Sequence, residues 1–274
     1  MFGLGRVNQH FTRRIKASNS LKTPLRTMIT LYDIPCTLGD DHPRSPNVWK
    51  TRVALKYKGL QYKTEWVAFP DIKPLMQKLG APPSAKSRSG TEFYTVPVIY
   101  DSTTGHYIAD SFKIAQYLDT TYPSTPPLFP AGADVVASFE KHFIRETVSP
   151  LIPLMVPRVI THLQPRCTEF FRTTREQRFK CTIEEIAPDG SEKRKEGWEK
   201  VRKSLDTFAG CLTENGALGP YLFGEAPTQA DFIVLGWLLW IKTLSPEEWE
   251  PISHANGGRW GDLVHATEKY QEFS

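Results

Sequence analysis

The sequence predicts an α/β domain followed by an all-α helical bundle. Within about 95 residues after residue 27, β-type alternation and helical spacing take turns in the order βαβαββα, which is typical of parallel strands joined by helices and closed by an antiparallel hairpin. A proline-rich segment follows, and no strand alternation is found beyond it. The length of 274 residues suits two such domains.

In the first domain, the expected helix ends are marked by specific residues. Ser45 suits an N-cap, Pro46 suits the first helical position, and Gly59 suits a helix end. The expected elements, in order, are a strand at 28–34, a helix at 45–58, a strand at 62–67, a helix at 71–80, strands at 96–100 and 106–109, and a helix from Ser111. Residues 82–90 read as a loop.

A segment with four prolines, residues 122–132, predicts a semi-rigid linker between domain 28–121 and domain 133–274. Beyond it, helical spacing is found at about 133–163, 167–186, 191–215, 228–243 and 258–272. Pro150, Pro153 and Pro157 are expected to break or kink the first of these helices.

Residues 1–27 form a basic leader with six basic residues and no acidic one. Its apolar residues approximate one helix face, which is typical of a mitochondrial transit peptide. The alternative is a disordered basic tail upstream of a second start at Met28. The apolar positions are Phe2, Leu4, Val7, Phe11 and Ile15.

Charge and composition exclude several partners. Six of the 34 basic residues lie in the leader, leaving 28 basic against 30 acidic residues, so we expect no nucleic-acid partner. The longest apolar run, 232–241, has about half of the roughly 20 residues that span a bilayer, so we expect no membrane partner.

The four cysteines are widely spaced and form no CxxC pair, which predicts neither a zinc site nor a disulfide framework and favours a reducing, cytoplasmic location. They are Cys36, Cys167, Cys181 and Cys211. The sequence holds no HExxH, GxxxxGK[ST], GxGxxG or GxSxG motif. It therefore gives no support for a metalloprotease, a P-loop protein, a dinucleotide-binding enzyme or a serine hydrolase.

Four local features stand in a telling order. Ser45-Pro46-Asn47-Val48 opens the first helix, where Ser45 is either a simple N-cap or a hydroxyl donor. Val96-Pro97 leads a strand, a place that tolerates proline because proline cannot donate to the ladder. Asp110-Ser111 opens the next helix, and Thr228 with Asp231 forms a capping box before 232–240.

Together these features make the chain, from Met28 onward, resemble a glutathione transferase, with a thioredoxin-like first domain and a helical second one. The strings ITLYDIP, SPNVWKTRVALKYKGL, YTVPVI, DSFKIAQYLD and EAPTQADF look like the etherase-like glutathione transferases of wood-decay fungi, which are related to bacterial β-etherases.

The resemblance implies a site for glutathione as co-substrate, without a metal. Ser45 would hydrogen-bond the thiolate, with Asn47 as a second donor. A cis Val96–Pro97 bond would turn the Val96 backbone toward the cysteinyl part. Asp110 would pair with the α-amino group of the γ-glutamyl moiety, and Ser111 and the helix-end amides would take its carboxylate. The family usually has Glu or Gln where Asp110 stands.

Serine and valine stand where thioredoxin-like redox enzymes place two cysteines, so a dithiol cycle is excluded. Cys36 is a competing candidate for the sulfur contact, and a nucleophilic Cys36 would favour thiol transfer. A hydrophobic electrophile pocket is expected between the domains, and its candidate residues also read as ordinary core. They are Phe143, Leu151, Met155 and Trp237, with Ile160 and Trp240 as further options.

Two functions therefore stay open. The first is a serine-type transferase that attacks hydrophobic or aromatic electrophiles, with β-aryl-ether cleavage and detoxification of wood-derived phenolics as a special case. The second is a non-catalytic, ligandin-type protein that holds aromatic compounds in the same cleft. The resemblance implies a homodimer.

Overall fold

The computed structural model describes residues 28–37, 45–214, 216 and 219–272. The predicted basic leader, residues 1–27, lies outside the described residues.

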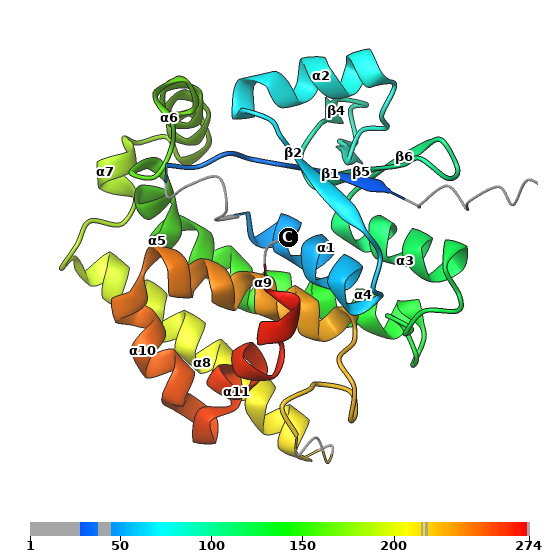
Figure 1. Cartoon of the computed structure of the whole chain (residues 1–274). Helices are drawn as coiled ribbons and strands as arrows, with labels where there is room; N and C mark the ends of the chain where they lie inside the picture. The colour runs from blue at the N-terminus through cyan, green and yellow to red at the C-terminus, as the bar shows by residue number, and fades with distance from the viewer. Residues whose placement is uncertain (1–27, 38–44, 215, 217–218, 273–274) are drawn as a thin grey trace, which may run out of the picture.

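A four-stranded mixed sheet organises the first domain (Figure 1). Its strands are β1 (Ile29–Asp33), β2 (Tyr62–Trp66), β5 (Val98–Asp101) and β6 (His106–Ala109), in the spatial order β2-β1-β5-β6. β1 pairs parallel with β2 and antiparallel with β5, and β5 pairs antiparallel with β6. Helices α1 (Pro46–Tyr57) and α3 (Ser111–Thr121) cover one face, and α2 (Ile72–Leu79) covers the other. This is the thioredoxin-like arrangement that the sequence predicts.

A short hairpin lies where the sequence predicts only a loop. Strands β3 (Ala85–Lys86) and β4 (Glu92–Phe93) pair antiparallel beside α2. Each strand has two residues, too few to show alternation. A single 3₁₀ turn, η1 (Phe69–Asp71), leads into α2.

The register brings the ends of three strands together at one end of the sheet. Tyr32 near the end of β1 lies opposite Val98 at the start of β5. Val98 in turn lies opposite Ala109 at the end of β6. The segments after β1, after β6 and before β5 therefore all lie at the same end of the sheet. Helix α3 begins there.

The second domain is entirely helical in its described part. Its α-helices are α4 (Ala133–Phe143), α5 (Ser149–Ile160), α6 (Pro165–Phe179), α7 (Ile183–Ile186), α8 (Glu192–Glu214), α9 (Gln229–Leu244), α10 (Pro246–His254) and α11 (Arg259–Ala266). A π-helical stretch, η2 (Ile144–Val148), joins α4 to α5, and the 3₁₀ turns η3 (Ala255–Gly258) and η4 (Glu268–Tyr270) flank α11. None of the described helices is at once long and apolar enough to cross a membrane.

The helix predictions differ from the structure in three places. The predicted helix 133–163 has a π-helical break at Ile144–Val148, upstream of its prolines, and Pro153 and Pro157 lie inside α5. The predicted helix 167–186 is two helices, because Lys180 adopts a left-handed backbone that ends the first. Helix α10 was not predicted, although Pro246 stands at its start.

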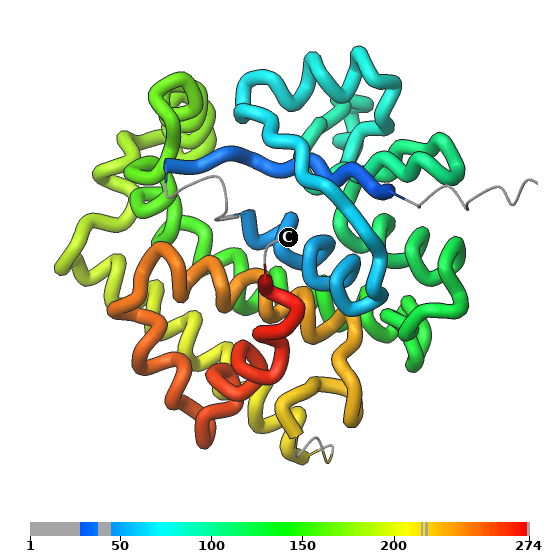
Figure 2. The backbone as a smooth tube through the Cα atoms, in the orientation of Figure 1, coloured from blue at the N-terminus to red at the C-terminus, as the bar shows by residue number. Residues whose placement is uncertain are grey.

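Helix α9 is the central element of the second domain and lies along α1 (Figure 2). Its residues Gln229–Ile241 are all buried, which explains the long apolar run without a membrane. The ring of Phe232 packs edge-on against Tyr57 near the end of α1, at 5.6 Å between centroids. Gly236, one turn further along α9, faces Pro46 at the start of α1. The two helices are therefore antiparallel.

The segment 122–132 is fastened to both domains. The carboxylate of Asp119 accepts hydrogen bonds from the backbone N–H groups of Leu128 and Phe129. The carbonyl of Leu128 accepts one from the N–H of Gln229, at the start of α9. Lys58 donates to Asp119 and to the carbonyl of Pro126. Leu128 itself is fully buried.

Candidate functional site

Ser45 is the N-cap of α1, and its backbone is extended. Its hydroxyl oxygen accepts a hydrogen bond from the N–H of Val48 at 3.4 Å, and its carbonyl accepts one from the N–H of Trp49 at 3.0 Å. A hydroxyl that accepts through a lone pair still has a proton to donate. The capping role and a donor role are therefore compatible, and the half-buried side chain is accessible for both.

The electrostatics at this helix end favour an anion. The first turn of α1 contains no acidic residue, and Pro46 occupies its first position. The partial positive charge of a helix N-terminus is therefore not offset by a carboxylate on the helix itself. Asn47, the second-choice donor, is half-buried in the same turn.

The Val96–Pro97 peptide bond is cis, as the resemblance implies. Val96 is nearly buried, just before β5. The carbonyl of Pro97 accepts a hydrogen bond of 3.3 Å from the N–H of Asp110. The structure thus joins two of the predicted glutathione-binding segments directly.

Asp110 has an uncommon backbone conformation, with φ of 85° and ψ of 127°. Non-glycine residues at positive φ are uncommon, and surrounding interactions must hold them there. Here the Asp110 carboxylate caps α3 by accepting from the N–H groups of Phe112 and Lys113, each at 3.1 Å. The carbonyl accepts from Ile114 at 2.8 Å.

This cap modifies the predicted role of the helix end. The amides at the start of this helix were expected to hold a ligand carboxylate, but those of Phe112 and Lys113 already donate to the Asp110 carboxylate. The side chain of Ser111, 5% exposed, is left as the polar group beside them. The sequence could not reveal this, because the same Asp-Ser pair suits a cap and a ligand equally well.

The four residues expected to line an electrophile pocket are buried. Phe143, Leu151, Met155 and Trp237 are each at most 5% exposed. Phe143 belongs to an aromatic cluster with Phe139 and Phe208, at 5.9 and 5.4 Å between centroids. Helical spacing of apolar residues predicts an inward face, and it does not distinguish core from cavity lining.

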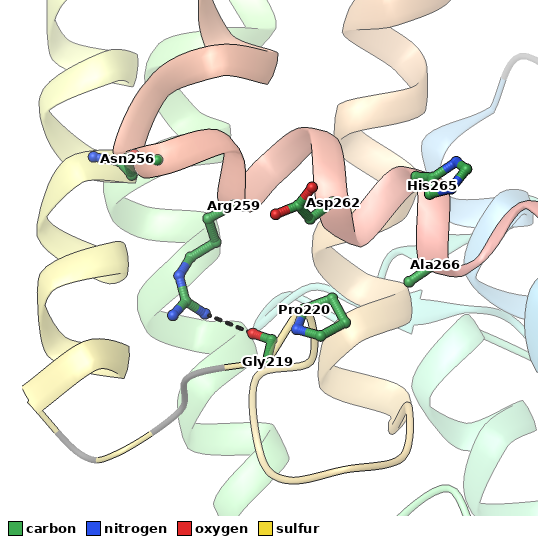
Figure 3. Close-up of a pocket in the computed structure, with 8 residues that line it drawn as sticks. Gly219, Pro220, Asn256, Arg259, Asp262, His265 and Ala266 are labelled. Carbon is green, nitrogen blue, oxygen red and sulfur yellow. Dashed lines mark hydrogen bonds between the residues drawn. The ribbon is translucent and has the colours of Figure 1, made fainter.

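Two hollows in the described part of the chain lie elsewhere, in the helical domain. One, of about 340 Å³, lies between α11 and Gly219–Pro220, where Arg259 reaches the Gly219 carbonyl at 3.5 Å (Figure 3). The other, of about 290 Å³, is lined by residues of α8, including Arg194 and Arg202, together with Glu248. Neither includes a residue predicted for the site.

Cys36 lies in the loop after β1 and is 5% exposed. The N–H of the next residue, Thr37, donates to the carbonyl of His162 at 3.1 Å, which fastens this loop to the second domain. Within the described ranges, no three His, Cys, Asp or Glu side chains gather as a metal site would require.

Sequence reasoning missed the residues that hold α1 in place. Lys50 is 2% exposed and forms an ion pair with Glu140 of α4 at 2.9 Å. Arg52 pairs with the fully buried Asp33 at 3.0 Å and donates to Thr64 of β2.

A glycine inside an apolar helix signals close approach of a neighbour, and this signal at Gly236 was available in the sequence.

Comparisons with known proteins agree with this architecture. Residues 44–121 match the family described as the glutathione S-transferase N-terminal domain, and residues 135–270 match its C-terminal domain. A glutathione S-transferase of Ceriporiopsis subvermispora, crystallised in complex with glutathione, is 39% identical with a TM-score of 0.86, over 90% of this chain and 98% of that chain. The glutathione transferase GSTFuA3 of Phanerochaete chrysosporium is 36% identical with a TM-score of 0.82, over 90% and 98% of the two chains.

A curated relative extends the comparison. The glutathione S-transferase-like protein ustS of Aspergillus flavus is 32% identical in an alignment of 253 positions that covers 88% of this chain and 90% of that protein. Since both domain families match in order and the relatives align along nearly their whole length, this chain belongs to the glutathione S-transferase family of enzymes.

Proposed function

We propose that the chain conjugates glutathione to hydrophobic or aromatic electrophiles, and that Ser45 donates a hydrogen bond to the glutathione thiolate. The position of Ser45 supports this most. Its lone pair caps α1, its proton is available, and the N-terminal end of α1 lies behind it. Asn47 is the second donor in the same turn.

The magnitudes are sufficient for this role. Lowering the pKa of a thiol by about two units requires about 2.7 kcal/mol of preference for the thiolate. A hydrogen bond to an anion contributes about 1.5–3 kcal/mol. The helix end adds about 0.3–1 kcal/mol. Ser45 and α1 together can therefore supply the whole shift.

The rest of glutathione is proposed to bind along the segments before β5 and at the start of α3. The Val96 backbone would meet the cysteinyl part. Asp110 would attract the α-amino group of the γ-glutamyl moiety, and the Ser111 hydroxyl would meet its carboxylate. Support comes from the bond between Asp110 and Pro97, which fixes these segments together, and from the relative that binds glutathione.

For an aryl ether substrate, the proposed step is a substitution. The glutathione sulfur forms a C–S bond to the β-carbon while the C–O bond breaks, and the phenolate leaves with the electron pair and takes a proton from solvent. This finer activity rests on the resemblance of the local strings to etherase-like transferases. The role in detoxification remains a prediction on the same ground. The homodimer remains a prediction from the family resemblance, and the cytoplasmic location remains a prediction from the widely spaced cysteines.

The test is glutathione conjugation to a chlorodinitrobenzene, an isothiocyanate and a β-aryl ether, by wild type and Ser45→Ala. We expect Ser45→Ala to lose at least about 10-fold in kcat/KM while glutathione still binds, because a hydrogen bond to the charged sulfur is removed. Asn47→Ala is the matched variant in the same turn and is expected to lose less. Wild type without turnover on any electrophile, but with tight binding of aromatic compounds, would favour the ligandin-type function instead.

A further inference from the structure

We propose that Gly236 of α9 is a positioning residue for the Ser45 hydroxyl. The proposal rests on the function proposed for Ser45 and identifies what holds that hydroxyl in place. A Cβ atom built on Gly236 would lie 2.3 Å from the carbonyl oxygen of Pro46 and 3.3 Å from its carbonyl carbon. Real Cβ contacts do not fall below 3.0 Å, so any side chain at this position must displace the first turn of α1.

The obstacle is backbone, which cannot rotate away as a flexible side chain does. Gly236 has no positive φ, so its conformation does not call for glycine. Glycine is also a poor helix former and is unfavourable within a helix. Close contact with Pro46 is therefore the physical reason for a glycine at this point of α9.

A shift of Pro46 reaches Ser45 directly. The two residues share a planar peptide bond, and the proline ring fixes the φ angle of Pro46. Ser45 is also bonded to the same turn through its carbonyl, which accepts from Trp49 at 3.0 Å, and through its hydroxyl, which accepts from Val48 at 3.4 Å. The hydroxyl thus moves with the turn.

Lys50 closes the other side of the contact. Its Cγ lies 3.3 Å from the same built Cβ. Its Nζ forms the 2.9 Å ion pair with Glu140 and lies 5.7 Å from the centroid of the Trp237 ring. Because this ammonium is buried, the Lys50 stem cannot swing aside without breaking the ion pair. Gly236 of α9 therefore packs between the Pro46 carbonyl and the Lys50 side chain, which the ion pair holds in place.

The experiment measures the pKa of the thiol of bound glutathione, from the ultraviolet absorbance of the thiolate and from the pH profile of kcat/KM. We expect Ser45→Ala to raise this pKa by about 1–2 units. Gly236→Ala is expected to raise it by about 0.5–1 unit, a 3- to 10-fold loss of thiolate at a pH below the pKa. The affinity for glutathione should change less than the thiol pKa, because Asp110 and Ser111 lie at the start of α3 and not on α1.

The matched control is Gly261→Ala. There the built Cβ would lie 2.7 Å from the backbone carbonyl oxygen of Ser253, a clash with backbone between α11 and α10 that also falls below 3.0 Å. This variant should lower the melting temperature and leave the thiol pKa unchanged. A folded Gly236→Ala with the wild-type thiol pKa, alongside a raised pKa in Ser45→Ala, overturns the inference. An unchanged pKa in Ser45→Ala overturns the proposed function, and the inference with it.

Should Gly236→Ala fail to fold, a variant with Lys50→Met decides. Methionine keeps the stem beside Gly236 and removes the ammonium that clamps it to Glu140. Because Lys50→Met alone also removes a positive charge near the thiolate, the deciding variant combines it with Glu140→Gln, which removes both charges of the pair. A raised thiol pKa in this double variant supports the positioning of Ser45 by this contact, and a wild-type pKa overturns it.

Discussion

The ammonium of Lys50 and the carboxylate of Glu140 lie 2.9 Å apart across the boundary between the two domains. Lys50 stands on α1, one turn after Ser45, and Glu140 stands on α4. The side chain of Lys50 is 2% exposed and that of Glu140 is 15% exposed. This largely buried ion pair therefore links α1, whose N-terminus carries Ser45, to the helical domain.

We expect Glu140→Ala to reduce the free energy of unfolding by about 3 kcal/mol or more, because it leaves a buried ammonium without its partner. Chemical denaturation checks this value. Glu92→Ala, which breaks the exposed ion pair with Lys86, is the control and should leave the midpoint unchanged. Equal losses of unfolding free energy in both variants would show that burial does not make the Lys50–Glu140 pair more important for stability than an exposed pair.

Asp231 makes stability depend on pH. Burial raises the pKa of its carboxyl to about 6, although the carboxylate accepts from the N–H groups of Leu222 and Thr228 and from the Thr228 hydroxyl. An unfolded Asp has a pKa of about 3.9, so the folded state holds the proton more tightly. The contribution of this group to stability is therefore complete below about pH 4 and is lost as pH rises to about 6.

The loss attributable to Asp231 is about 3 kcal/mol in total. Urea denaturation of wild type and Asp231→Asn at a series of pH values isolates it, because all other titrating groups are common to both proteins. The difference in unfolding free energy between them should change by about two thirds of this amount between pH 4 and pH 6 and become level above about pH 7. A difference that is constant from pH 4 to pH 7 would contradict the raised pKa.

Asp110→Asn separates charge from capping at the start of α3. Asparagine keeps an acceptor for the N–H groups of Phe112 and Lys113, and like aspartate it is enriched at positive φ. We expect the Kd for glutathione to rise about 10-fold or more, with little change in stability. Asp110→Ala should lose the affinity and, in addition, about 1 kcal/mol of stability with the cap. Calorimetric titration and thermal unfolding measure the two effects, and wild-type affinity in Asp110→Asn would remove Asp110 from the glutathione site.

Cys36 and Cys211 should differ in their reaction with oxidised glutathione. Cys36 is 5% exposed, whereas Cys211 is exposed on α8. We expect mass spectrometry of wild type to find the mixed disulfide on Cys211 and none on Cys36, since disulfide exchange requires access to the sulfur. Cys36→Ala should keep the conjugating activity, and Cys211→Ala should lose the adduct. An adduct on Cys36 would instead support thiol transfer as the reaction.

Local signals in the sequence predicted the elements that define the fold. Strand 106–109 and the start of the helix at Ser111 agree with the structure to the residue, because Asp110 supplies both a strand end and a cap. The capping box of Thr228 and Asp231 is likewise present. Such features depend on residues close in sequence, and sequence patterns register them well.

Contacts between distant residues were not predictable in this way. The burial of the four expected pocket residues and the partner of Lys50 both depend on how helices pack. The family resemblance indicated which segments meet, and the pairing of Asp110 with Pro97 agrees with it. Only the structure shows which atoms of each segment remain available to bind a ligand.

The anchoring of residues 122–132 has a consequence for how this enzyme can be divided or extended. Leu128 is buried and hydrogen-bonds to Asp119 of the first domain and Gln229 of the second. The segment is therefore an integral part of the folded structure and not a flexible linker. Cleavage or insertion there would expose apolar surface on both halves at once, so the halves should unfold in a single cooperative transition. A reporter sequence belongs at an exposed turn such as Ser87–Gly90, where the backbone has few long-range contacts to lose.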